Sequence, residues 1–345
     1  CSDGPRLDEF LAEMRREVFE GREGYMNVGE APGITPERNE FITNPAHKEL
    51  DMLFLFDHVS VDQSPESKWD THAFVPKNLQ DRMSRQQEAV RNAGWASLFF
   101  CNHDQPRVVS RWGNDSDRES RELSAKAFGM LLHMHRGTPY IYEGEELGMT
   151  NAHFTSLDQY RDLEAINAYR QRVEEARCQS PESMMAALAL IGRDNARTPM
   201  QWDASRYAGF TPADAATEPW IGVNPNHVEI NAAEEFDDPD SVYGFYKKLI
   251  AMRHNSATVA TGEWNLLAAD DEQVYAFTRT GGDDTILVVV NLTDRSAGLP
   301  GEVAELLGDG VAESQILLST YDVAHGVKSI ARGELARWEG VVIQL

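Results

Sequence analysis

A chain of 345 residues exceeds the usual single-domain range of ~100–200 residues, so it has room for one large barrel or for two domains. Its formal charge of −24, from 32 basic and 56 acidic residues, disfavours binding to nucleic acid or anionic lipid and favours a neutral small-molecule partner. The apolar runs, such as 286–290, are far shorter than the ~20 residues that cross a bilayer, so we expect no membrane span.

The cysteines are Cys1, Cys101 and Cys178, an odd number at wide spacing with no C-x-x-C pair. This pattern predicts neither a disulfide framework nor a zinc site, and we expect no metal and no cofactor. A reducing, cytoplasmic location is the interpretation that fits. The sequence opens without Met and without a charged-then-apolar leader, and we interpret it as a chain already under way.

Short apolar runs alternate with helical patterns over the first 150 residues. Four runs that end in polar clusters predict strands at 25–29, 52–56, 96–101 and 139–142. Apolar and charged residues at spacings of three to four predict helices at 80–92 and 121–135. Such alternation is typical of parallel strands joined by crossover helices, and about four units make half of an eight-fold barrel.

The pattern is irregular from 144 to about 240, apart from a helical stretch at 159–178, and a loop region of this length is usually functional. A final amphipathic helix is predicted at 241–255. Beyond about 261 the period changes to two, with a hairpin signal at Gly281-Gly282-Asp283. We predict a partial α/β barrel domain over 1–260 and a small antiparallel β-sandwich domain over 261–345.

Three clusters could carry chemistry. The first is Val28-Gly29-Glu30, which places a carboxylate at the carboxyl end of a strand, the end where barrel active sites lie. An isolated Glu there is more often a solvated loop residue. The second is 99–107, in which Asn102, His103 and Asp104 follow an apolar strand directly. A turn ended by Pro106 and a structural histidine are the alternatives.

The third cluster, 193–203, contains Arg193, Asp194, Arg197 and Trp202. It could be a rigid loop fixed by Arg–Asp pairs. Alternatively, an Arg fork suits the grip of vicinal hydroxyls or a carboxylate, and a Trp offers a face on which a sugar stacks.

Together these clusters resemble the α-amylase family, glycoside hydrolase family 13, and within it the oligo-1,6-glucosidase and α-glucosidase subgroup. Further stretches resemble that subgroup in the same order, namely Asp57-His58-Val59, 136–142, 144–150 and 158–162. The resemblance covers nearly the whole chain and is loosest in the terminal β domain. It implies that the four strands are strands five to eight of a (β/α)8 barrel, with 144–240 as a long insert.

The resemblance also implies roles for individual residues. Glu30 would be the general acid/base and Asp104 the carboxylate that stabilises the transition state, while His103 and Arg197 would bind the sugar. The family's nucleophilic Asp is expected upstream of Cys1, so we expect this fragment alone to be inactive. Retaining cleavage needs a protonated acid and a second carboxylate ~5 Å away, and the acid stays protonated near neutral pH when it is buried.

The implied activity is a retaining α-glucosidase that removes terminal α-linked glucose from short oligosaccharides. A sucrose isomerase or a transglucosidase of the same family is an alternative, since water and sugar compete for one intermediate. A non-catalytic heavy chain of an amino-acid transporter is a third; such proteins carry a membrane span and typically lose the carboxylates, whereas Glu30 and Asp104 are both present here.

Overall fold

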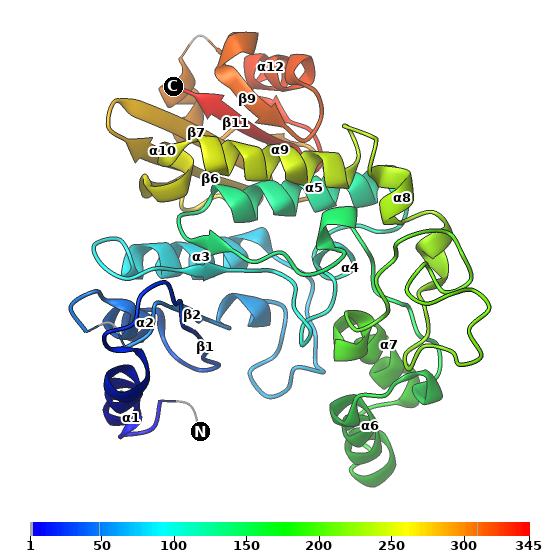
Figure 1. The fold of residues 1–345 in the computed structure, drawn as a ribbon. Coiled ribbons are helices and arrows are strands. Elements are labelled where there is room, and N and C mark those ends of the chain that lie inside the picture. Colours follow the sequence, from blue (N-terminus) through cyan, green and yellow to red (C-terminus); the bar gives the residue numbers. More distant parts are fainter. Residues whose placement is uncertain (1–2, 48, 309) are drawn as a thin grey trace.

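The computed structural model describes residues 3–47, 49–308 and 310–345 (Figure 1). Its first part contains four short parallel strands, β1 (Val28–Glu30), β2 (Met52–Phe54), β3 (Ser97–Leu98) and β4 (Thr138–Pro139). β1 pairs with β2 and β3 with β4, while a parallel bridge between Leu53 and Ala96 joins the two pairs. The strands therefore follow one another in chain order, as expected for half of a (β/α)8 barrel.

Helices follow each of the first three strands. They are α2 (Pro36–Thr43), α3 (Pro76–Ala89), α4 (Val108–Arg111) and α5 (Arg118–Met134), while α1 (Leu7–Met14) precedes β1. The predicted helices at 80–92 and 121–135 are present as α3 and α5, but each begins earlier. Pro76 occupies the first turn of α3, and the Asp117 side chain accepts a hydrogen bond from the Ser120 amide at the start of α5.

The strands are shorter than the apolar runs that predict them, and β4 lies slightly before the predicted 139–142. The Tyr140 amide makes the last bond of this ladder, to the Leu98 carbonyl at 2.8 Å. The chain then turns through Gly144, whose φ of +85° lies in the left-handed region that favours glycine. Tyr142 therefore belongs to the loop after β4 rather than to the strand.

The insert contains more helix than the sequence suggests. The predicted helix at 159–178 is present as α6 (Leu163–Tyr169), which continues into a π-helical turn at Arg170–Glu175. A second helix, α7 (Pro181–Ile191), lies where we expect irregular chain, and a short α8 (Ala232–Glu235) follows. Met184, Leu188 and Ile191 of α7 are buried in a separate apolar cluster, so the insert has a core of its own.

The predicted helix at 241–255 is confirmed as α9 (Val242–Asn255), with Ser241 as its N-cap, and α10 (Ala257–Thr261) follows. The predicted face is buried at Val242, Phe245, Tyr246 and Leu249. α9 packs along α5, where Gly129 leaves room for the Tyr246 ring: a Cβ added at Gly129 would lie 2.7 Å from Tyr246 Cε2.

The C-terminal part is an antiparallel β domain, as predicted. Its five-stranded sheet has the order β5-β6-β7-β11-β9, and β8 pairs with β10 beside it. The elements are β5 (Glu263–Leu267), β6 (Val274–Gly281), β7 (Asp284–Asn291), β8 (Ala297–Gly298), α11 (Gly301–Leu307), β9 (Ile316–Ser319), α12 (Val323–Arg332), β10 (Glu334–Leu335) and β11 (Gly340–Gln344). The hairpin predicted at Gly281-Gly282-Asp283 joins β6 to β7, with Gly281 opposite Asp284.

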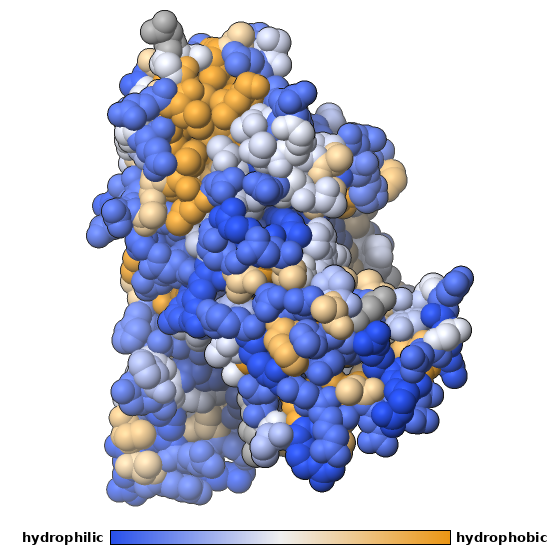
Figure 2. All heavy atoms as spheres, turned by 90° about the vertical axis from the view of Figure 1, so that its left-hand side faces the viewer, coloured by the Kyte–Doolittle hydropathy of each residue, from blue (hydrophilic) through white to orange (hydrophobic). Residues whose placement is uncertain are grey.

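One apolar cluster runs from α5 into this sheet and includes Phe128, Phe277, Val288 and Trp338. Within the seam the buried guanidinium of Arg279 donates to the carbonyls of Met134, Val259 and Gly262 at 2.7–2.8 Å. Figure 2 shows the face of the molecule that lies at the left of Figure 1. On this face apolar side chains reach the surface mainly at the top, over the antiparallel sheet.

Candidate active site

Polar side chains gather at the carboxyl ends of the parallel strands. Glu30 is the last residue of β1, and Asn102, His103 and Asp104 lie in the loop that follows β3. Because the carboxyl ends of parallel strands face the same side of a barrel, these loops meet there. Glu30 and His103 line one hollow of about 320 Å³.

Aromatic rings form much of the wall of this hollow. Phe54, Phe99 and Tyr140 come from three successive strand segments, and the Phe54 ring packs edge-on against the other two at centroid distances of 5.3 and 4.5 Å. The Tyr140 hydroxyl donates to the Met52 sulfur at 3.1 Å. The hollow thus has apolar walls with polar groups at its carboxyl-end side, as ligand sites usually have.

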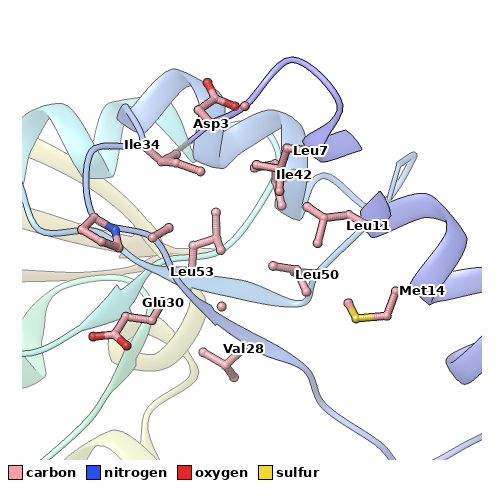
Figure 3. Close-up of a pocket in the computed structure, with 14 residues that line it drawn as sticks. Asp3, Leu7, Leu11, Met14, Val28, Glu30, Ile34, Ile42, Leu50 and Leu53 are labelled. Atoms are coloured by element: carbon pink, nitrogen blue, oxygen red, sulfur yellow. The ribbon is translucent and has the colours of Figure 1, made fainter. Parts of the chain in front are cut away.

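The two faces of β1 differ sharply. Val28 and Glu30 project on one side of the strand, whereas Leu50 and Leu53 lie on the other with Ile34 and Ile42 (Figure 3). Gly29 faces those leucines, because a Cβ there would lie 2.5 Å from Leu53 Cδ2. The alternation is that of a strand with period two, and it directs the Glu30 carboxylate toward the hollow.

The burial expected around Glu30 is not present among the described residues, where its side chain is exposed. In that part of the chain β1 pairs with β2 on one edge only. One side of Glu30 is therefore open to solvent.

His103, Asp104 and Arg197 are brought together across 93 residues of chain. Arg197 Nη2 donates to Asp104 Oδ1 at 2.5 Å, and Arg197 Nε donates to the His103 carbonyl at 2.7 Å. His103 Nε2 lies 3.7 Å from Asp104 Oδ2. The Asn102 side-chain oxygen accepts a hydrogen bond from the Asp104 amide at 2.7 Å, and this bond shapes the turn.

A second arginine belongs to the same network. Arg193 makes a bidentate pair with Asp162, at 2.6 and 2.9 Å, and its Nη1 lies 3.4 Å from Asp104 Oδ1. Burial is the largest single influence and raises the pKa of Asp162, but the hydrogen bonds from Arg193 and from the Glu164 amide, together with the charges of Arg193 and Arg197, outweigh it and lower that pKa. The stretches 158–162 and 193–203 are both in the sequence resemblance, yet only their contact in space assigns Arg193 and Asp162 to the site.

The buried side chain of Arg107 ties together the loops that carry these residues. Its Nη1 donates to the Glu143 carbonyl at 2.5 Å and its Nη2 to the Ala196 carbonyl at 3.3 Å. Its guanidinium carbon lies 5.0 Å from the centre of the Tyr142 ring, and the Tyr142 hydroxyl also donates to Ala196. Arg107 therefore connects the loop after β3 with the loop after β4 and with the 193–197 turn.

Glu145 follows the turn at Gly144 directly and is buried. The Tyr246 hydroxyl donates to its Oε1 at 3.1 Å, and no described residue hydrogen-bonds its Oε2. Burial raises the pKa of this carboxyl to about 7, and the bond from Tyr246 opposes the rise.

Within residues 3–47, 49–308 and 310–345, no three His, Cys, Asp or Glu side chains gather where they could hold a metal ion. In the same ranges no helix combines the length and apolarity needed to cross a bilayer. Cys101 is buried behind the hollow, and burial raises the pKa of its thiol well above the usual value, with Glu145 adding to the rise.

Comparison with known proteins assigns this arrangement to a family. The family model described as the alpha amylase catalytic domain matches residues 1–262, and the maltogenic amylase C-terminal domain matches residues 264–313. The chain belongs to the α-amylase family. Within this family it is 42% identical to an oligo-1,6-glucosidase of Parageobacillus thermoglucosidasius over 347 residues, covering 99% of this chain and 59% of that protein.

Solved structures of family members agree. The trehalose-6-phosphate hydrolase of Bacillus licheniformis is 38% identical with a TM-score of 0.85, and the match covers 99% of this chain and 60% of that one. A trehalulose synthase is 34% identical with a TM-score of 0.88, over the same shares of the two chains. The chain thus spans about 60% of the length of the relatives it matches.

Proposed function

We propose that this chain supplies the acid/base and sugar-holding part of the active site of a retaining α-glucosidase of the oligo-1,6-glucosidase kind. The observation that carries the proposal is the Asp104 carboxylate, held by Arg197 and next to His103, which lines one hollow together with Glu30. Both the oligo-1,6-glucosidase at 42% identity and the position of these groups at the strand ends support it.

The roles follow from the chemistry of glycosidic cleavage. Glu30 would donate a proton to the leaving oxygen, and Asp104 would stabilise the positive charge that develops on the sugar. The attacking carboxylate would come from the part of the family's barrel that precedes these residues. The same part would also pack against the open edge of β1 and bury Glu30, which a general acid requires.

A neighbouring donor and acceptor suit the hydroxyls of a terminal glucose. Arg197 presents N–H donors beside the Asp104 oxygens, so a pair of adjacent hydroxyls could accept from one and donate to the other. The hollow, at about 320 Å³, lies at the small end of the ~300–1,000 Å³ range of ligand pockets. Short α-glucosides are therefore the proposed substrates, rather than long chains such as starch.

A sucrose isomerase is the second candidate, because solved trehalulose and isomaltulose synthases resemble the chain at TM-scores of 0.88 and 0.87. The experiment uses the enzyme in which this chain is joined to the remainder of its barrel. Incubation with isomaltotriose, maltotriose, sucrose and starch should release single glucose units from the short α-glucosides. Conversion of sucrose into another disaccharide would favour the isomerase, and early mixed oligosaccharides from starch would refute the glucosidase.

Glu30→Gln in that enzyme tests the acid. Activity should fall most on substrates with poor leaving groups such as sugars, whereas aryl glucosides should still form the intermediate. Glu37→Gln, a change on an exposed face of α2, is the matched control and should leave both rates unchanged. Equal losses on the two substrate classes would contradict the assignment of Glu30.

We further propose that the 345 residues alone have no glucosidase activity. The described residues provide four parallel strands of the eight in a closed barrel, and Glu30 stays exposed. Turnover of p-nitrophenyl α-glucoside by the purified 345-residue chain would overturn this proposal.

A further inference from the structure

A second hollow, of about 490 Å³, lies on the insert. One wall is the segment that contains Asp158 and Arg161, and the other is the loop between α7 and α8, which contributes Arg206, Glu218 and Trp220. This loop lies at the right of Figure 1, beside α7. No residue assigned to the reaction above lines this hollow.

The indole of Trp220 is exposed although the backbone beside it is anchored in the insert. Its side chain is 70% exposed, whereas the next residue, Ile221, is 2% exposed and belongs to the core of the insert. Arg161 Nε donates to the Trp220 carbonyl at 3.3 Å and fixes the backbone from the other wall. A single exposed apolar residue needs no explanation, but an exposed indole that lines a hollow and stands on an anchored backbone offers a flat binding face.

The positive and negative side chains around the indole are equal in number. Arg161 and Arg206 stand against Asp158 and Glu218, and Arg206 Nη2 lies 3.5 Å from Glu218 Oε1 where both side chains are mostly exposed. A charged ligand would meet as much repulsion as attraction here, and the overall charge of −24 adds repulsion for anions. A neutral ligand with many hydroxyls can use both the N–H donors and the carboxylate acceptors.

Hydrogen bonds hold the 158–162 wall of this hollow against the active-site loops. The Arg161 amide donates to Asp194 Oδ2 at 2.6 Å, and the neighbouring Asp162 pairs with Arg193 on the active-site side. The segment 158–162 therefore presents Asp158 and Arg161 to the second hollow, while Asp162 pairs with Arg193 beside Asp104. The second hollow shares no lining residue with the hollow that Glu30 lines.

We propose that this second hollow binds a short neutral oligosaccharide, with the apolar face of one sugar ring stacked on the Trp220 indole. The hydroxyls around the ring would bond to the carboxylates and guanidinium groups of the two walls. Binding requires neither Glu30 nor Asp104, so this site is independent of the proposed hydrolysis.

Fluorine NMR on the 345-residue chain tests the proposal directly. The sequence holds seven tryptophans, so incorporation of 5-fluorotryptophan gives few resonances, and the one missing in Trp220→Phe belongs to Trp220. Isomaltotriose at ~10 mM fills roughly nine-tenths of a site with a Kd of ~1 mM. The Trp220 resonance should shift saturably, while those of the buried Trp69, Trp112, Trp264 and Trp338 stay in place.

Variants identify the source of the signal. Trp220→Ala should weaken oligosaccharide binding at least about tenfold in calorimetry. Phe236→Ala removes an aromatic ring that is 59% exposed but outside the hollow, and should leave the affinity unchanged. Asp104→Asn should leave the Trp220 shift intact, which separates this site from the proposed catalytic one.

Sorbitol, which has hydroxyls but no ring face, should not move the Trp220 resonance. A Trp220 resonance that stays fixed during the isomaltotriose titration would overturn the proposal, and so would an unchanged affinity in Trp220→Ala. Loss of the shift in Asp104→Asn would assign the binding to the active site instead and would equally overturn it.

Discussion

Replacement of the buried Glu145 by Gln should stabilise the protein at alkaline pH. One carboxylate oxygen accepts from Tyr246, no described residue hydrogen-bonds the other, and burial raises the pKa to about 7 from the ordinary glutamate value of 4.5. The folded state therefore keeps a proton that the unfolded state releases at lower pH. Stability from this group is fully present below about pH 4.5, declines as the pH rises and is lost above about 7.

The size of the effect follows from the pKa difference. A shift of ~2.5 units at ~1.36 kcal/mol per unit corresponds to about 3 kcal/mol of unfolding free energy. Gln keeps the acceptor for Tyr246 and carries no charge at any pH. Glu145→Gln should therefore match the parent near pH 4.5 and exceed its stability by up to about 3 kcal/mol near pH 8.

Urea unfolding followed by circular dichroism, at several pH values from about 5 to about 8, measures this difference. Glu305→Gln, on an exposed position of α11, is the control and should track the parent at every pH. Burial also raises the pKa of Glu235 to about 7, so the parent and Glu145→Gln share that second dependence, and it cancels when they are compared. A stability difference that does not change with pH would refute the reasoning.

Three further predictions concern the loops of the candidate site. Gly144→Ala should cost about 2–4 kcal/mol of unfolding free energy, because its φ is +85° and the new Cβ would overlap the Met149 sulfur, whereas Gly282→Ala, at φ +64° in open space, should cost about 1 kcal/mol; urea midpoints compare the two. Arg107→Lys should cost about 2–3 kcal/mol, because one ammonium cannot satisfy both the Glu143 and Ala196 carbonyls, and limited proteolysis should cut the adjoining loops faster. In the enzyme with its whole barrel, Asp104→Asn should lower kcat by ~10²–10³ with an unchanged melting temperature; a collapse of stability with normal specific activity of the folded fraction would make Asp104 structural.

Sequence patterns predict an element well when one face of it is buried. α9 is an example, since Val242, Phe245 and Leu249 recur at helical spacing and all three are buried. α7 was not predicted because residues 184–191 are apolar almost without interruption and show no single face. Its start signals were nevertheless present, as Ser180 caps the helix and Pro181 occupies its first position.

The candidate site was only partly predictable for a related reason. The resemblance to the family named His103, Asp104 and Arg197, and these three lie in contact. Arg193 and Arg107 act through contacts with residues that are separated from them by 31 to 89 positions in the sequence. No local sequence pattern predicts contacts over such separations. The exposure of Glu30 was also not predictable from its own strand, since it depends on what lies beside the free edge of β1.

The buried guanidinium of Arg279 limits how the C-terminal sheet could be exchanged among relatives. It donates to the carbonyl of Met134 at the end of α5 and to the carbonyls of Val259 and Gly262, and burial lowers its pKa to about 9. A transplanted sheet without a cation at this position would leave three carbonyls without donors inside an apolar seam. Successful recombination between family members should therefore cross over within the barrel or within the sheet, but not between Arg279 and the helices it joins.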